Sequence, residues 1–577
     1  MASSPQLFPF PAGVDRPATD RDEGVRPASA QPGADVYAAA ILGEATRVLS
    51  LMDREALSPT AGCGDRTFWS WKFVDFPASR LQESLCVLSF LYSTPLSESP
   101  YHRNARLLEW ITRGLQFWSE IQHPDGSFDE AYPFERSLAA TAFTSFYVGE
   151  ALEMIKGDLP ASTLDATRGT LARAGAWLAA NDETHGFLSN HLAAAAGALA
   201  HAFRQTGETR FNDRSRYFLD KILRRQSPEG WYDEYGGPDP GYQTHGSFYL
   251  ARCWEFSGDA RLGDSLARAS RFLAHFLHPD GSLGGEYASR NTQTYYPAAF
   301  EMRAAHDPAS AWIARAMRSG VGSGAAAGLH CVDLFNYFPF LNNYVFAFKA
   351  AAARPEPAPA VEPSPDPGLV WFPKAGLARV RTARYDAYVG TAKGGVVKVF
   401  DRRRRALIYS DCGYVGRLRS EKSVSSQYYD PERPVRVSEA SIEVDGDLVE
   451  FSRPTMTPVM FVGFRIFTLT VGRFPGLGRW LKALLVKTLI YRRRSIAVKF
   501  TRRVEFNELG VRVADRLVGP GGSEITELRR ETVFTTIHMG SSRYFIANEL
   551  ADIPAGERID PETVTGGVAL ERTVTVN

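Results

Sequence analysis

Hydrophobic residues follow a helical period from residue 35 to residue 353. Apolar side chains recur every three or four residues in segments such as LLEWITRGLQFW and TLARAGAWLAA, and Ala, Leu and Arg are abundant throughout. This spacing places the apolar side chains along one face of a helix. We therefore predict that residues 35–353 are helical.

The pattern changes after residue 367. Segments such as ARVRTARYDAYVG, GVVKVFD, SIEVDGDLVEFS and SIAVKFTRRVEF alternate apolar and polar residues and are rich in β-branched side chains, which is typical of antiparallel strands. Residues 354–367 contain six prolines, a composition that neither a helix nor a central strand tolerates. We predict a helical domain (35–353), a linker (354–367) and a β-domain (368–577), preceded by a disordered arm (1–34).

The helical half contains a repeat. HPDGSFDE, ETHGFLSN, SPEGWYDEY and HPDGSLGGEY place glycines at positions 126, 186, 230 and 281, at intervals of 60, 44 and 51 residues. Each interval holds one pair of antiparallel helices, whose apolar faces must be buried against neighbouring pairs. Such pairs predict an α/α toroid, incomplete or closed, with an open solenoid as the alternative. In a toroid the glycine-containing loops lie on one rim.

Residues 455–494 interrupt the alternation of the β-domain. Within this segment, RWLKALLVKTLI has the pattern of a short amphipathic helix that carries Trp480 and Leu484 on its apolar side, with Arg and Lys residues around it. An apolar stripe with flanking cations suits a helix that lies on anionic lipid. The alternative is a helix packed against the sandwich. We expect a possible peripheral membrane contact through this segment.

Composition narrows the function classes. Lys and Arg number 66 against 65 Asp and Glu, so no overall field attracts nucleic acid. The five cysteines are widely spaced and form no CxxC pair, which describes neither a disulfide framework nor a zinc site. The first residues lack a cationic segment followed by an apolar one. We expect a cytoplasmic protein, with peripheral contact to the inner face of the membrane, and without cofactor or metal.

Two segments concentrate chemically useful side chains. Asn190 and His191 open the Ala-rich stretch SNHLAAAAGALAHAF, where helix capping is the simplest alternative role for Asn190. The stretch PEGWYDEYGGPDPGYQTHGS is a Gly- and Pro-rich loop that holds Glu234, Tyr242 and His245. Loops of this kind carry function more often than packing. We take both segments as candidate parts of one active site.

Together these segments resemble the heparinase II/III-like superfamily of polysaccharide lyases. In that superfamily a helical toroid precedes a β-sandwich, an Asn-His pair begins one toroid helix, and a Tyr follows in a later loop. Here Tyr242 follows His191 by 51 residues, and Pro228-Glu229-Gly230 replaces the usual turn. The resemblance implies β-elimination on an acidic, uronate-containing polysaccharide or oligosaccharide within capsule or exopolysaccharide metabolism, with Asn190, His191 and Tyr242 as catalytic residues.

The chemistry requires these residue types. A base removes the proton next to the uronate carboxylate, and an acid protonates the departing glycosidic oxygen. Hydrogen-bond donors such as Asn190 stabilise the enolate-like charge. His191 is a base or donor near neutral pH, and Tyr242 relays a proton or acts as base if a cation lowers its pKa. His245 and Arg290 are the candidate cations, although Arg290 could instead pair with Glu286.

Further residues complete the expected substrate-binding set. Besides His245 and Arg290, this set comprises Trp231, Glu234, Tyr295 and Lys393. Lys393 stands where the superfamily places a His in its β-domain, and no His occurs between His330 and His538. A solvated hairpin lysine is the alternative role for Lys393. We therefore expect no metal site and leave open whether the β-domain contributes to catalysis.

Three other function classes fit the same sequence. A uronyl C5-epimerase would use the same proton abstraction without cleaving the bond. An inverting glycoside hydrolase would use paired carboxylates, for which the repeated loops offer candidates: Asp125, Asp129, Glu130 and Glu135. A non-catalytic glycan-binding or assembly protein would explain the missing β-domain His. The sugar, its linkage, endo or exo action and the oligomeric state stay open.

Overall fold

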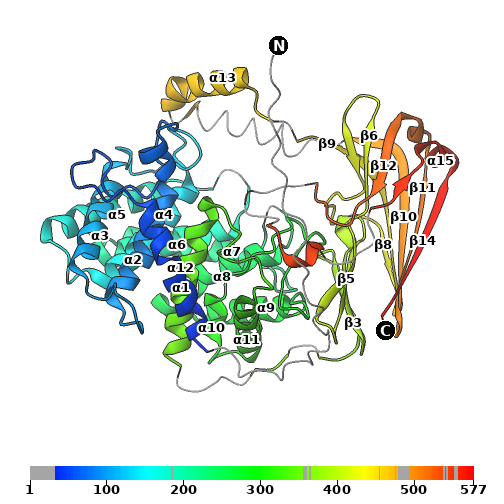
Figure 1. Ribbon diagram of the computed structural model, residues 1–577, viewed down its shortest axis with the longest axis horizontal. Helices are drawn as coiled ribbons and strands as arrows, with labels where there is room; N and C mark the ends of the chain where they lie inside the picture. The colour runs from blue at the N-terminus through cyan, green and yellow to red at the C-terminus, as the bar shows by residue number, and fades with distance from the viewer. Residues whose placement is uncertain are drawn as a thin grey trace, which may run out of the picture.

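The computed structural model describes residues 33–577 except 184–185, 235, 355–359, 363–364, 454, 475, 478–493, 537–539, 541–543, 551–555 and 577. Helices occupy its N-terminal part and antiparallel strands its C-terminal part (Figure 1). This arrangement confirms the predicted fold class. The described helices begin at Asp35, and residues 1–32 of the expected arm lie outside the described range.

The helices form pairs of one outer and one inner helix. The outer helices are α1 (Asp35–Leu51), α3 (Ala105–Glu120), α5 (Ala161–Ala180), α7 (Thr209–Arg225), α9 (Ala260–Ala274) and α11 (Pro308–Ser323). The inner helices are α2 (Ser84–Ser93), α4 (Leu138–Ile155), α6 (Ser189–Thr206), α8 (Pro240–Ser257), α10 (Ala298–Arg303) and α12 (Leu334–Ala352). Successive inner helices contact each other, and α12 returns to contact α2. The toroid is therefore closed.

The sequences of the two rings explain their positions. Inner helices α4 and α6 bury residues on all their faces, and most of these are small or apolar. Outer helices α3, α7 and α9 instead bury one apolar stripe and expose polar side chains. An amphipathic helix buries only one face, whereas a helix that is apolar all round requires burial on every side. This difference separates the inner ring from the outer ring.

The repeated glycines shape the turns on one rim. Gly126 and Gly230 have φ values of +95° and +104°, which favour glycine. A Cβ atom at either position would lie 2.3–2.4 Å from a backbone oxygen of the next outer helix. At these two turns, glycine therefore allows the turn to lie directly against the neighbouring helix pair.

The C-terminal part contains two antiparallel sheets. The first is a meander of β1 (Gly368–Phe372), β2 (Leu377–Arg381), β3 (Tyr385–Gly390), β4 (Val396–Asp401) and β5 (Ala406–Asp411). The second has the order β13-β12-β6-β7-β9-β10-β11-β14, with β8 beside β9. Its strands are β6 (Tyr414–Leu418), β7 (Ser423–Ser425), β8 (Val435–Val437), β9 (Ser441–Phe451), β10 (Ser495–Asn507), β11 (Gly510–Val518), β12 (Ile525–Arg530), β13 (Arg558–Ile559) and β14 (Val568–Thr575).

The first sheet lies between the toroid and the second sheet. One of its faces packs with residues of α9 and α11, including Phe272 and Met317, and the other packs with Val444 and Val513 of the second sheet. Strands β2, β3 and β4 are consequently buried at every position. An alternating pattern is typical of strands with one solvated face, but the toroid covers that face in these strands.

The interrupting segment leaves the sandwich. Helix α13 (Pro458–Leu469) follows β9, whereas the predicted helix with Trp480 and Leu484 falls within residues 478–493, outside the described part. A short helix α15 (Pro561–Gly566) precedes β14. Among the described residues, no helix combines the length and the apolar character needed to cross a membrane.

Candidate functional site

A short strand-like pairing joins the two candidate segments. Leu188 forms an isolated bridge with Glu234. Next to it, the backbone N–H and the hydroxyl group of Ser189 donate to the carbonyl oxygen of Asp233, at 3.3 and 2.8 Å. The backbone N–H of Asn190 donates to Glu234 Oε1 at 3.1 Å. These bonds hold the first turn of α6 against the loop that leads into α8.

Asn190 is buried at the start of α6. Its side-chain Oδ1 accepts a hydrogen bond from the His191 backbone N–H at 2.7 Å. The N-cap residue is Leu188, which makes no side-chain cap, so Asn190 does not have the capping role considered above. Gly246 of α8 packs at the Asn190 backbone, where a Cβ atom would lie 3.5 Å from Asn190 Cα. The two helices thus meet at Asn190.

His191 is oriented by a carboxylate. Its Nδ1 lies 2.8 Å from Glu183 Oε2, and its side chain is 22% exposed. A carboxylate at Nδ1 favours the tautomer with the proton on that nitrogen. Nε2 is then the nitrogen that can accept a proton from a ligand. The ring also lies edge-on to Phe143, with centroids 5.5 Å apart.

Tyr242 and His245 lie on one face of α8. The N-cap Asp239 accepts a hydrogen bond from the Tyr242 backbone N–H at 3.0 Å, and Tyr242 is half-buried. His245 follows one turn later and Tyr249 one turn after that, where i, i+3 and i+4 positions share a face. His245 Nε2 lies 2.9 Å from the Tyr249 hydroxyl oxygen. The half-buried Tyr242 is therefore the outermost member of this row.

His245 is packed between aromatic rings. It stacks on Tyr296, with centroids 4.1 Å apart, and lies parallel to Phe143 at 5.6 Å. Burial, together with the charges of Arg80 and His191, lowers the pKa of His245 well below its usual value. A neutral ring does not supply the positive charge that we expected from it. We correct that expectation: His245 is a buried, uncharged neighbour of the catalytic candidates.

Arg80, which sequence analysis missed, supplies a positive charge. Its guanidinium carbon lies 4.4 Å from the centre of the Phe143 ring, and its Nη1 donates to Glu130 Oε1 at 3.0 Å. Its Nε also pairs with the buried Glu83. Arg80 comes from the aromatic-rich segment before α2, where no motif distinguishes it. We group Arg80, Asn190, His191, Tyr242 and His245 under the name Phe143 cluster. Of these, Arg80, His191 and His245 lie against the Phe143 ring, whereas Asn190 and Tyr242 are their neighbours on α6 and α8.

Arg290 approaches from the last repeated loop. Its backbone N–H and that of Thr292 donate to Asp239 Oδ2, at 3.1 and 3.3 Å. Asp239 therefore joins this loop to the first turn of α8. Glu286 pairs with Lys398 of β4 rather than with Arg290 as the alternative supposed. Burial raises the pKa of Asp239 above its usual value, against the opposing effect of the backbone hydrogen bonds that it accepts.

The β-domain reaches this loop through Lys393 and Tyr429. Lys393 is fully buried, and its Nζ donates to the carbonyl oxygens of Ala288 and Ser289, each at 3.0 Å. Lys393 is therefore not the solvated hairpin lysine of the alternative above. Its two hydrogen bonds hold the loop that contains Arg290 against the β-domain. The Tyr429 ring lies so close to Gly237 that a Cβ atom there would be 2.4 Å from it. The β-domain thus helps to shape the loops around the cluster.

Three residues of the expected substrate-binding set have structural partners. Tyr295 is fully buried, and its hydroxyl donates to the Met317 carbonyl at 3.3 Å. Trp231 donates from Nε1 to Glu229 Oε2 at 3.0 Å and packs on the domain interface. Glu234 is buried, and burial raises the pKa of its carboxyl group well above the usual value. Glu234 contacts the Phe143 cluster by accepting the hydrogen bond from the Asn190 backbone N–H.

The carboxylates of the first repeated loop form hydrogen bonds and ion pairs with the loop and its neighbours. Asp129 accepts hydrogen bonds from His123 and from the backbone N–H groups of Phe134 and Arg136. Glu135 accepts from two backbone N–H groups, and Glu130 pairs with Arg80. Asp125 accepts from Ser127 and pairs with Arg136. Each of the four carboxylates named for the glycoside hydrolase alternative therefore has a structural partner.

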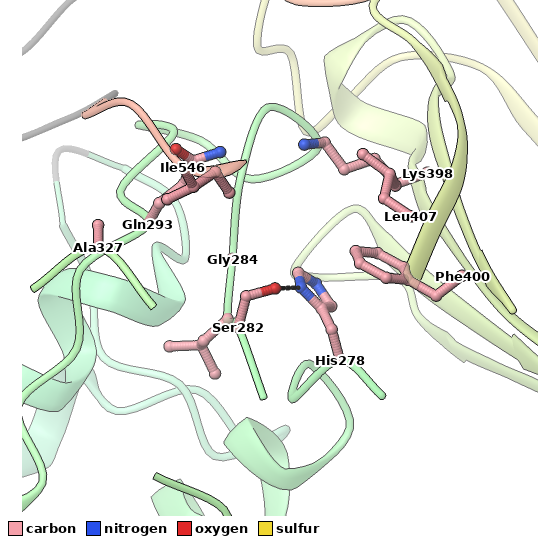
Figure 2. A pocket seen from close by; sticks show the side chains of 10 residues that line it. His278, Ser282, Gly284, Gln293, Ala327, Lys398, Phe400, Leu407 and Ile546 are labelled. Carbon is pink, nitrogen blue, oxygen red and sulfur yellow. Dashed lines mark hydrogen bonds between the residues drawn. The ribbon is translucent and has the colours of Figure 1, made fainter. Parts of the chain in front are cut away.

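The domain interface contains a small cavity beside His278, Ser282 and Lys398 (Figure 2). His278 Nδ1 lies 2.7 Å from the Ser282 hydroxyl oxygen. The cavity measures about 10 Å³, which suits at most a single water molecule. It is too small for a sugar ring.

Comparison with known proteins supports the fold. No protein-family model and no curated protein matches the chain. Among solved structures, the Streptomyces coelicolor A3 chondroitin AC lyase in complex with chondroitin sulphate superposes with a TM-score of 0.54 at 13% identity, over 88% of this chain and 69% of the lyase. A Paenibacillus xanthan lyase gives 0.54 at 9% identity, over 86% of this chain.

The chain spans less than half, 46%, of the xanthan lyase. At these identities the likeness concerns the backbone arrangement. The arrangement of a helical N-terminal domain followed by an antiparallel β-domain is shared with both enzymes. The chain therefore has the fold of polysaccharide lyases.

Proposed function

We propose that this protein cleaves an acidic, uronate-containing polysaccharide or oligosaccharide by β-elimination. The observation that carries the proposal is that α6, which bears Asn190 and a carboxylate-oriented His191, packs on α8, which bears Tyr242, with Gly246 of α8 at the Asn190 backbone. The chondroitin AC lyase, whose structure holds chondroitin sulphate, supports an acidic glycan as substrate.

In the proposed reaction, His191 Nε2 or the Tyr242 phenolate removes the C5 proton of a uronate. The electron pair forms the C4=C5 double bond while the C4–O bond breaks, and the Tyr242 hydroxyl protonates the leaving oxygen. The amide group of Asn190 and the guanidinium groups of Arg80 and Arg290 stabilise negative charge on the carboxylate. No water is consumed.

Mass spectrometry of the products distinguishes this reaction from its alternatives. Incubation with chondroitin, hyaluronan, heparan sulfate, alginate and xanthan should yield, from at least one, fragments whose masses sum to that of the substrate. Fragments that gain one water per cleavage would identify a hydrolase. Deuterium uptake from D₂O without cleavage would identify an epimerase, and either result would overturn the lyase proposal.

A further inference from the structure

Residues 452–494 are inserted between two neighbouring strands. β9 and β10 pair antiparallel, with Ser495 opposite Val449, so a tight hairpin would suffice to connect them. The chain instead leaves the sandwich and places α13 over the far end of the toroid (Figure 1). An excursion of this length out of a sheet needs a reason other than strand connection.

Helix α13 is held on the toroid by defined contacts. Phe464 lies edge-on to Tyr132, with centroids 5.0 Å apart, and Arg465 forms an ion pair with Asp75 at 3.4 Å. After the helix, Arg136 donates to the carbonyl oxygens of Gly472 and Arg473, at 3.3 and 2.9 Å. The helix therefore has one face fixed against the protein.

The outward face of α13 is apolar. Val459, Val462 and Ile466 are 82%, 56% and 59% exposed, and Leu469 is also exposed. The only charged side chain of the helix, Arg465, is directed to Asp75 on the protein side. A surface helix of a soluble protein ordinarily has the opposite orientation, with polar side chains outward. A contiguous apolar surface of this kind marks an interaction site.

Neighbouring segments extend this surface. Trp71 and Phe73, at 66% and 89% exposed, precede Asp75 and Phe76, which Arg465 contacts. Phe474 is 65% exposed just after the helix. We call Trp71, Phe73 and the outward residues of α13 the apolar rim.

The charge of the insertion indicates the chemistry of the partner. Residues 452–494 contain no Asp or Glu. Their basic residues are Arg453, Arg465, Arg473, Arg479, Lys482, Lys487, Arg492, Arg493 and Arg494. Exposed apolar side chains within a cationic, acid-free segment complement a surface that is both apolar and anionic.

We infer that the apolar rim docks on an anionic lipid bilayer, with α13 lying in the interface. The apolar rim lies at the same end of the toroid as the proposed active site. The loop that contacts α13 through Tyr132 and Arg136 also supplies Glu130, which pairs with Arg80. Docking would hold the Phe143 cluster near the lipid surface. The docking itself does not depend on the proposed reaction.

Vesicle flotation of the full chain tests this inference. We expect binding to vesicles of phosphatidylcholine with phosphatidylglycerol, weaker binding to phosphatidylcholine alone, and loss at high salt. The double variant Val462→Asp/Ile466→Asp should bind about tenfold or more weakly. Because both side chains are exposed, its melting temperature should equal that of the wild type. Leu509→Asp, at an exposed site of the β10–β11 turn, is the matched control and should bind normally.

Absence of binding to the anionic vesicles, or equal binding of the double variant, would overturn the inference. Analytical ultracentrifugation tests whether a second copy of the chain binds this surface instead. A wild-type dimer that dissociates in the double variant would assign the apolar rim to a second copy of the chain, and would likewise overturn it.

Discussion

Tyr242 bears the hydroxyl group that the proposed elimination uses on the leaving oxygen. Tyr242→Phe removes only this oxygen from a half-buried side chain. We expect kcat to fall by about 10²–10⁴-fold, the usual contribution of a positioned proton donor, with KM and melting temperature nearly unchanged. Tyr217→Phe, on the exposed surface of α7, is the control. Turnover of Tyr242→Phe at near wild-type rate would remove Tyr242 from the mechanism.

Lys393 makes stability depend on pH. Burial, with a smaller effect of Arg290, lowers the pKa of its ammonium group to about 7, whereas the unfolded chain keeps a value of about 10.4. Below the lower value both states are protonated and the folded state bears the cost of the buried charge. Between the two values only the unfolded chain holds the proton, so the free energy of unfolding rises with pH.

Lys393→Met lacks this dependence. From about pH 6 to about pH 10, the stability of the wild type should therefore improve relative to the variant by on the order of a few kcal/mol. Chemical denaturation at both pH values measures the difference. A difference that stays constant with pH would show that Lys393 keeps an ordinary pKa.

Sequence alone identified part of the candidate site. The Asn190-His191 pair and Tyr242 stood out by their order and spacing along the chain. The expected loop, however, ends before Pro240, so that Tyr242 and His245 lie in α8. Arg80 was missed because its relation to Phe143 exists only after the ring of helices closes. Tyr295 and Lys393 were selected by position in the chain, which does not reveal that one hydroxyl turns inward and that the toroid covers the other side chain.

At the scale of elements, the neighbouring strands β10 and β11 each contain an arginine that pairs with carboxylates, one buried and one exposed. Arg502 is buried and bonded to Asp515 at 2.8 Å and to Asp411 at 2.9 Å. Arg512 is exposed and bonded to Glu571 and Glu505 at 2.6 and 2.7 Å. Each arginine is bonded to two carboxylates, so the two sites differ mainly in burial.

Replacement by alanine should separate them. Arg502→Ala removes the closest cation from two buried carboxylates, leaving Arg530 and Arg572 at 3.6 and 3.9 Å from them, and should lower the free energy of unfolding by about 3–5 kcal/mol. Arg512→Ala should cost about 1 kcal/mol or less, because water screens exposed pairs. Urea denaturation of both variants checks this; similar losses would contradict the role given to burial.

Secondary structure followed the sequence pattern closely. The helical period predicted the helices, and the alternating segments correspond to β2, β3, β4, β9 and β10. The exception is α13, which was not predicted: within the interrupting segment the sequence analysis placed a helix only at residues 479–490, outside the described part. The apolar composition of α13 also does not indicate whether its apolar face lies inward or outward. That orientation depends on Tyr132, Asp75 and Arg136, which lie far away in the sequence.

At the scale of the whole molecule, the toroid and the sandwich form a tight interface. Gly390, at the end of β3, lies so close to the Arg290 loop that a Cβ atom there would be 2.3 Å from the Tyr287 carbonyl oxygen. Gly390→Ala should therefore displace the loop, destabilise the protein by about 1–3 kcal/mol and lower kcat/KM.

Gly157→Ala is the control for this variant, because no atom lies within 4 Å of a Cβ atom at that position. Thermal unfolding and turnover are measured for both variants. Wild-type behaviour of Gly390→Ala would mean that the interface adjusts without cost and that the β-domain does not position the Arg290 loop.

The repeated turns predicted the helical pairs, but they did not decide between an open solenoid and a closed ring. Closure depends on α12 meeting α2, a contact between the two ends of the helical domain. The burial of the first sheet on both faces could not be predicted from the sequence either, because it results from the docking of two separately predicted domains.

The most direct test of the central claim is ultraviolet absorbance during incubation with uronate-containing glycans. Elimination creates a C4=C5 double bond conjugated with the carboxylate, and hydrolysis or epimerisation does not. The wild type should generate this absorbance on at least one acidic glycan, and His191→Ala and Tyr242→Phe should abolish it. Glycan cleavage without any rise in absorbance, or a rise that persists in both variants, would contradict the account.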